Sequence, residues 1–160
     1  MKIGVAMFVT GTSIDVAPLA RRCEELGFES LWVPEHPAIP VNAKTPFPGS
    51  PDGVIPHNYS QIVDPFIALA RASAVTSTLK LGTGICLVPE RHPILLAKEI
   101  ASLDYFSGGR FLFGIGTGWL REETELFGVQ FKDRVRYTRE SILAMKELWT
   151  KEESEFHGKL

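Results

Sequence analysis

The sequence predicts an α/β fold with a parallel sheet, built from four strand–helix units and the start of a fifth strand. Strand-like and helix-like apolar spacings alternate along the 160 residues. The predicted strands begin near Ile3, Ser30, Lys80 and Phe111, about 36 residues apart on average, which suits strand–helix–strand units. Such units pair their strands in parallel through right-handed crossovers.

The first two units are separated by a long loop. Residues 2–8 are predicted as a strand, and a helix follows from Asp15 to a glycine stop at Gly27. Ser30–Val33 is the second predicted strand. The proline-rich stretch 35–64 comes next, and loops of this length in compact domains are usually lids or binding loops. We therefore expect 35–64 to be an active-site loop.

The third and fourth units follow without a comparable interruption. Asp64 and Pro65 have the pattern of an N-cap and a first helical residue, for a helix that runs to about Thr76. The next strand is expected at 79–87, a helix opens at His92-Pro93, and a further strand is expected at 110–115.

The last part of the sequence has a helical pattern. Residues 120–127 predict a short helix, in whose first turn Glu122 and Glu123 are expected to be solvated. Asp133 is the predicted cap of a long helix, and residues 155–160 are the expected entry to a fifth strand. The predicted core face of the long helix consists of Val135, Thr138, Ile142, Met145 and Trp149.

Composition excludes several classes of function. Seventeen basic and nineteen acidic residues give a net charge of −2, so no strongly basic surface is expected and nucleic acid is not a predicted partner. No apolar run approaches the ~20 residues that span a bilayer, and no signal-peptide pattern is found, so we expect a cytoplasmic protein without a membrane partner. Cys23 and Cys86 are expected to be buried, reduced thiols.

Candidate site residues follow the predicted strands, because sites in parallel α/β folds form at the carboxyl ends of strands. These residues are glycine, threonine, aromatic and histidine side chains, which suit a flat heterocycle lying against backbone. The glycine clusters match neither the Rossmann nor the phosphate-loop pattern, and relief of crowding explains each cluster equally well. No metal-binding pattern is present, so no metal is expected.

His36 is the candidate proton-transfer group. It directly follows the second strand, and the adjacent Glu35 is a carboxylate that could orient its ring. His92, which precedes a helix-opening proline, is expected to be a loop contact and not a ligand.

Six short strings stand in one order over most of the chain: Trp32–His36, Leu81–Ile85, Pro89–Pro93, Ala97-Lys98, Leu103–Arg110 and Gly114–Trp119. Together they resemble the N-terminal half of the bacterial luciferase-like flavin oxidoreductases, above all the branch that uses the deazaflavin coenzyme F420. The resemblance implies a (β/α)8 TIM barrel. Such a barrel takes about 250 residues, so residues 1–160 would be a truncated domain with about the first four βα units.

The resemblance also implies roles for particular residues. His36 would lie near the reactive centre of the deazaflavin ring, with Glu35 in a position where relatives more often have Asp. Gly84-Ile85 matches a bulge, often with a cis peptide, that backs the ring. The string that ends at Arg110 would lie at the opposite, stabilising face. The expected cofactor-binding residues are Phe8, Thr83, Gly84, Ile85, Gly116, Gly118 and Trp119.

The implied activity is hydride transfer between coenzyme F420 and a small organic substrate, in a protein that is a homodimer when full length. Some relatives carry a glutamate proton donor where this chain has Trp119, so that acid is not transferred. Two alternatives stay open. One is a monooxygenase that uses reduced FMN and oxygen. The other is a non-catalytic half barrel that binds flavin weakly or assembles with itself, because relatives place much of their phosphate-binding surface after the position of Leu160.

Overall fold

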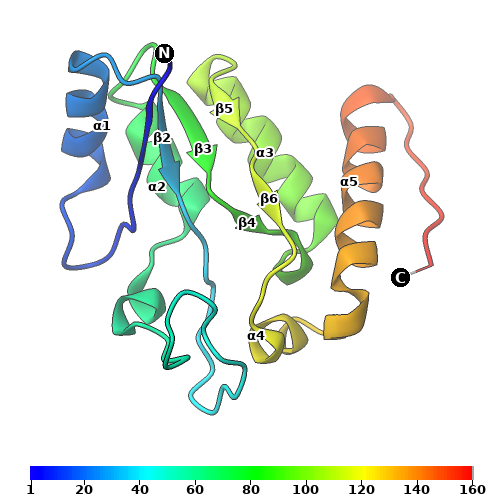
Figure 1. Ribbon diagram of the computed structural model, residues 1–160. Coiled ribbons are helices and arrows are strands. Elements are labelled where there is room, and N and C mark those ends of the chain that lie inside the picture. Colours follow the sequence, from blue (N-terminus) through cyan, green and yellow to red (C-terminus); the bar gives the residue numbers. More distant parts are fainter. Residues whose placement is uncertain (160) are drawn as a thin grey trace.

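The computed structural model describes residues 1–159, in which six short strands pair in parallel (Figure 1). The main sheet has the order β1-β2-β3-β5, and β4 pairs with β6 in a second, two-stranded sheet. Leu81 of β3 lies opposite Leu31 on one side and Phe111 on the other. The strands are β1 (Gly4–Ala6), β2 (Ser30–Val33), β3 (Lys80–Thr83), β4 (Cys86–Leu87), β5 (Phe111–Leu112) and β6 (Ile115–Gly116). The predicted parallel α/β architecture is confirmed.

Four helices pack beside one another along the sheet, in the sequence α1, α2, α3 and α5, while α4 lies near the ends of β4 and β6 (Figure 1). This succession of strand and outer helix is a partial barrel of about four βα units. The helices are α1 (Val16–Glu25), α2 (Pro65–Ser73), α3 (Pro93–Ser107), α4 (Arg121–Leu126) and α5 (Arg134–Thr150), with 3-10 turns at η1 (His57–Gln61), η2 (Val88–Glu90) and η3 (Phe131–Asp133).

Side-chain caps fix where the helices begin. Asp15 accepts a hydrogen bond from Ala17 N at 2.8 Å, and Asp64 accepts one from Ile67 N at 2.9 Å. His92, expected as a loop contact, is the N-cap of α3 and accepts from Ile94 N. Asp133 occupies the predicted N-cap position of α5, but its backbone is helical and its side chain makes no capping hydrogen bond.

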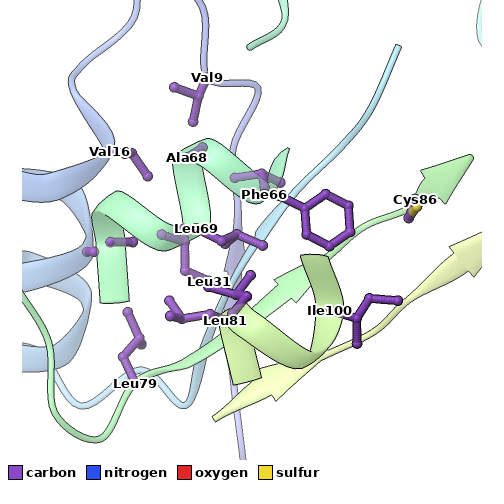
Figure 2. Packing of buried hydrophobic residues seen from close by; sticks show 14 of the residues in the cluster. Val9, Val16, Leu31, Phe66, Ala68, Leu69, Leu79, Leu81, Cys86 and Ile100 are labelled. Carbon is purple, nitrogen blue, oxygen red and sulfur yellow. The ribbon is translucent and has the colours of Figure 1, made fainter. Parts of the chain in front are cut away.

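The core lies between the outer face of the main sheet and the helices. Leu31 and Leu81 of the central strands meet Leu69 of α2, and all three are fully buried (Figure 2). Met145 of α5 joins the same cluster. Burial of each such side chain stabilises the fold by about 1.5–3 kcal/mol. Cys23 and Cys86 are buried and unpaired, as expected.

On the inner face of the main sheet, the side chain of Trp32 lies over the neighbouring strand β3. A Cβ atom on Gly82 would lie 2.3 Å from Cε3 of Trp32, so Trp32 can lie across the neighbouring strand only because residue 82 has no side chain. The glycine at position 82 therefore relieves crowding against Trp32, which is the structural one of the two interpretations of this glycine cluster.

Three strand predictions are corrected in their extent. The expected strands at 79–87 and 110–115 are each divided, at Gly84-Ile85 and between Leu112 and Ile115, so β4 and β6 form their own pair. The peptide bond between Gly84 and Ile85 is cis, and the chain bulges there instead of continuing the β3 ladder. The first strand is shorter than the expected 2–8.

Two predictions for the last part of the chain are wrong. Residues 155–159 form no strand: Lys159 N donates to Glu140 of α5, so this segment turns back along the helix and pairs with no strand. Leu160, the last residue of that prediction, lies outside the described residues. On α5, Val135 and Trp149 are 58% and 40% exposed and are not buried as predicted, because the buried face runs through Thr138, Ser141 and Met145.

At the amino ends of the strands, Arg110 connects several backbone segments by hydrogen bonds. Its guanidinium donates to the carbonyl oxygens of Ser73, Thr76, Leu79 and Ser107, at 2.6–3.2 Å. These acceptors come from the ends of two helices and the start of β3. These bonds confirm the structural role predicted for the sequence string that ends at Arg110.

Candidate active site

A cavity of about 380 Å³ lies at the carboxyl ends of the strands. Its lining combines residues after β2, from the bulge, from the loop after β6 and from η1 of the proline-rich loop. Seven predicted site residues line it: Phe8, Glu35, His36, Gly84, Ile85, Gly118 and Trp119. The lining is completed by Pro34, Tyr59, Leu87 and Thr117.

Two predicted cofactor-binding residues do not line the cavity. Thr83 is fully buried, and its hydroxyl donates to Gly114 O at 2.8 Å while it accepts from Gly114 N, so it joins β3 to the segment between β5 and β6. At Gly116, a Cβ atom would lie 1.8 Å from the end of the Ile85 side chain. Gly116 therefore makes room for Ile85, which is 43% exposed at the bulge.

His36 is held by Glu123 and not by Glu35. Its Nδ1 lies 2.7 Å from Oε2 of Glu123, and the other carboxylate oxygen accepts from Ala38 N at 3.1 Å. The side chains of His36 and Glu123 are only 7% and 1% exposed. With Glu123 ionised, Nδ1 carries a proton and donates it to the carboxylate. Nε2, which has no hydrogen-bond partner within residues 1–159, is left for the cavity.

The expected orienting role of Glu35 is contradicted by its contacts. Its carboxylate accepts from Leu87 N at 2.6 Å and from Nε of Arg91 at 2.7 Å, and it forms an ion pair with Arg91. Although Glu35 is among the lining residues, its side chain is only 1% exposed and its carboxylate is directed to Leu87 N and Arg91 and not to His36. Arg91 also pairs with Asp64 and Glu99.

Glu90 is a buried acid directly behind the cavity wall. Thr124 Oγ1 lies 3.3 Å from its Oε1, while Oε2 has no partner among the described residues. A Cβ atom on Gly118, a lining residue, would lie 3.3 Å from the same Oε1. Burial raises the pKa of Glu90 to about 9, and the nearby charges of Glu123 and Glu35 act in the same direction. Glu90 is therefore a neutral acid at pH 7.

Glu122 and Glu123, predicted as a solvated helical turn, both bind the proline-rich loop. Glu122 Oε1 accepts from Lys44 N at 2.8 Å and from Thr45 N at 3.2 Å, and Oε2 accepts from the Thr45 hydroxyl at 2.8 Å. Burial alone would raise the pKa of Glu122, but these bonds to the ionised form outweigh it, and the pKa is lowered. The prediction of solvated carboxylates is wrong.

Aromatic rings from the loop close the outer side of the cavity. Tyr59 lies 5.3 Å from Phe8 and 5.3 Å from His36 between ring centroids. Phe47 lies between Tyr59 and Trp119, at 5.1 and 5.5 Å. The proline-rich loop therefore contributes Tyr59 to the cavity lining, and its role as an active-site loop stays a prediction.

Sequence reasoning missed Glu122, Glu123, Phe47 and Tyr59. One signal could have found Glu123: it stands three residues after Leu120 and one before Thr124, on the face that α4 buries. A carboxylate on a buried face needs a partner. Phe47 and Tyr59 lie in a loop without periodicity, and no pattern distinguishes them there.

The strand order, the outer helices and the cavity at the carboxyl ends define a partial barrel of the TIM type. The chain belongs to the luciferase-like monooxygenase family, whose sequence model matches residues 7–160. An uncharacterised protein of Mycobacterium tuberculosis is 40% identical over 159 residues, 99% of this chain and 56% of the relative. The chain spans about half the length of the curated relatives it matches.

Solved structures agree with this assignment. The monooxygenase RslO1 from Streptomyces bottropensis has a TM-score of 0.81 at 28% identity, over all of this chain and 46% of its own. Two further structures, each 23% identical, share the fold. One is the oxygenating constituent of 3,6-diketocamphane monooxygenase from Pseudomonas putida in complex with FMN, with a TM-score of 0.78 over 99% of this chain and 42% of its own. The other is the coenzyme F420-dependent tetrahydromethanopterin reductase from Methanopyrus kandleri, with a TM-score of 0.68 over 99% of this chain and 43% of its own.

The comparisons therefore include both FMN and F420 proteins. No helix within residues 1–159 is long and apolar enough to cross a membrane.

Proposed function

We propose that this chain forms the ring-binding half of an F420-dependent oxidoreductase, which transfers a hydride between the deazaflavin and a small organic substrate. The observation that carries the proposal is the buried His36–Glu123 pair at a cavity whose other walls are apolar rings and backbone.

The lining residues fit the ring end of such a cofactor. Gly84 and Ile85 offer backbone and an exposed aliphatic side chain at the bulge, and Phe8 and Trp119 provide flat apolar walls. A tricyclic ring stacks on such surfaces with little need for charge. When bound, the deazaflavin supplies or accepts the hydride.

His36 supplies the proton that accompanies the hydride. A substrate that gains a hydride at one atom of a double bond accumulates negative charge at the other atom, which must then take a proton. The ionised Glu123 stabilises the doubly protonated imidazole, whose Nδ1–H it binds, so Nε2–H can donate into the cavity. The apolar walls exclude water and hold the two reactants together.

His36→Ala tests this proposal. We expect turnover of reduced F420 with substrate to fall by about 10²–10⁴-fold, the usual contribution of a positioned proton donor, while F420 binding measured by fluorescence is partly retained. His57→Ala, which removes an exposed histidine of the same loop, is the matched control and should keep full turnover. Unchanged turnover in His36→Ala would remove His36 from the mechanism.

A flavin monooxygenase is the second candidate, favoured by the 28% identity to a monooxygenase over the whole chain. Absorbance titrations with F420 and with FMN separate the two candidates. Saturable binding of FMN together with oxygen consumption by the reduced form would favour the monooxygenase. The homodimer and the cytoplasmic location stay predictions, the former testable by sizing the protein.

A further inference from the structure

Two neighbouring glutamates on α4 hold two different parts of the site. Glu123 binds His36 and the following Ala38, which places the proposed proton donor. Glu122 binds Lys44 and Thr45, six to nine residues further along the same loop. The pairing is long-range, since Glu122 lies 77 positions after Thr45 in the sequence.

Thr45, which Glu122 holds, stands two residues before Phe47. Phe47 packs at 5.1 Å against Tyr59 and at 5.5 Å against Trp119, so it separates two rings that line the cavity. The turn that follows Phe47 is held by local bonds, from Phe47 N to Gly53 O and between Ser50 and Asp52. Glu122 thus supplies hydrogen bonds that join the start of this turn to the barrel, beside the ring contact between Phe47 and Trp119.

We propose that Glu122 is a positioning residue that sets substrate specificity: by fixing Thr45 it places Phe47 and keeps Tyr59 and Trp119 as the outer wall of the cavity. This inference rests on the proposed function for its catalytic part. Its structural part, that Glu122 anchors the loop, stands without any cofactor.

The wall also indicates the chemistry of the substrate that contacts it. Tyr59 and Trp119 are aromatic lining residues, and the one carboxylate among the lining residues, Glu35, is paired with Arg91. No lysine or arginine lines this cavity within residues 1–159. The part of the substrate that meets this wall is therefore flat and uncharged, such as an aromatic or conjugated carbonyl compound.

Limited digestion with trypsin tests the anchor directly. Lys44 is the single lysine or arginine between His36 and Asp64, it is exposed, and its own N–H and that of Thr45 are the two amides that Glu122 binds. Cleavage after Lys44 requires these bonds to open. We expect Glu122→Ala to be cut there at least about tenfold faster than the native protein.

Matched variants keep this test decisive. Glu125→Ala removes the same charge from an exposed position of the same helix and should be cut at the native rate. Thr45→Val removes only the hydroxyl contact and should give an intermediate rate, which covers the case in which Glu122→Ala folds poorly. Equal rates for the native protein, Glu122→Ala and Thr45→Val would overturn the anchor.

Steady-state kinetics test specificity. In Glu122→Ala we expect the KM for a flat, uncharged substrate to rise about tenfold with kcat within about threefold, and the fluorescence Kd for F420 to stay unchanged. Glu122→Gln, which keeps one acceptor oxygen, should restore part of the KM. An unchanged KM in a variant that trypsin cuts faster would overturn the specificity role. A native protein without F420 turnover would reject the proposed function and leave the digestion result valid.

Discussion

Arg110 and Arg91 are both arginines with multiple partners, yet they lie at opposite ends of the sheet and meet opposite chemistry. Arg110, at the amino ends of the strands, donates to neutral backbone carbonyls and to the Thr76 hydroxyl. Arg91, at the carboxyl ends, meets three carboxylates, those of Glu35, Asp64 and Glu99.

The difference shows how the two ends of one sheet divide their tasks. At the amino end an arginine donates to carbonyl oxygens at and just beyond the ends of two helices, which stabilises the fold. At the carboxyl end the fold gathers an excess of carboxylates, of which Arg91 neutralises part, Glu90 stays protonated and Glu123 holds His36. Burial raises the cost of charge there, so each carboxylate has a defined partner or proton.

Removal of Arg91 is expected to have the largest effect. Arg91→Met leaves the Glu35 carboxylate buried without its cation, so the free energy of unfolding measured in urea should fall by about 3–5 kcal/mol. The double variant Arg91→Met with Glu35→Leu removes both charges and should regain more than half of that loss. Equal losses in the single and double variants would contradict this account of the pair.

Arg110→Lys should have a smaller effect. Lysine keeps the charge but has no planar fork, so several of the carbonyls at the amino end lose their donor, and the expected loss is about 1–3 kcal/mol. Because Arg110 lies at the end of the sheet away from the cavity, cofactor binding and turnover should stay native at temperatures where the variant is folded. A change in KM with no loss of stability would mean that the two ends are not separate in function.

Glu90→Gln should have an effect of the opposite sign, which is the smallest of the three near pH 5 and grows as pH rises. The pKa of Glu90 is raised to about 9 in the folded chain, so between its ordinary value and pH 9 the folded state keeps a proton that the unfolded state releases. Stability of the native protein therefore falls as pH rises through this range, and the amide variant lacks that term. We expect Glu90→Gln to match the native protein near pH 5 and to exceed it by up to about 4 kcal/mol at pH 8, because the native protein loses about 1.4 kcal/mol for each pH unit in between.

Thermal unfolding at a series of pH values measures this difference. Glu152→Gln, a change at an exposed glutamate, is the control and should run parallel to the native protein at every pH. A constant offset between Glu90→Gln and the native protein from pH 5 to 9 would show that Glu90 is ionised in the folded state.

The sequence could predict the elements that depend on local pattern. Asp15 and Asp64 cap helices as their spacing indicates, and β2 has the predicted bounds. His36 lies at the cavity because a residue that follows a parallel strand must reach that edge. The family resemblance supplied the bulge at Gly84-Ile85, which periodicity alone would have continued as a strand.

The partners of these residues could not be predicted, because they are set by distant contacts. Glu35 is next to His36 in sequence, and yet its carboxylate pairs with Arg91. The carboxylate that binds His36 is that of Glu123, 87 positions further along the chain. The helix dipole favours glutamates in a first turn whether or not they are solvated, so the pattern at Glu122 and Glu123 could not show that the proline-rich loop lies over α4. Thr83 likewise follows the site pattern but is buried against Gly114.

The adjacency of Glu122 and Glu123 restricts where the chain can change in length. One residue added or removed between Trp119 and Glu122 would turn α4 by about 100° and withdraw both carboxylates from His36 and Thr45 at once. Residues 48–56 carry no such bond to the barrel, since the hydrogen bonds of Ser50, Asp52 and Gly53 stay within the turn. Insertions and deletions between Pro48 and Pro56 can therefore change the outer wall of the cavity while His36 stays in place. This turn is the part of the cavity's surroundings where relatives can differ in length.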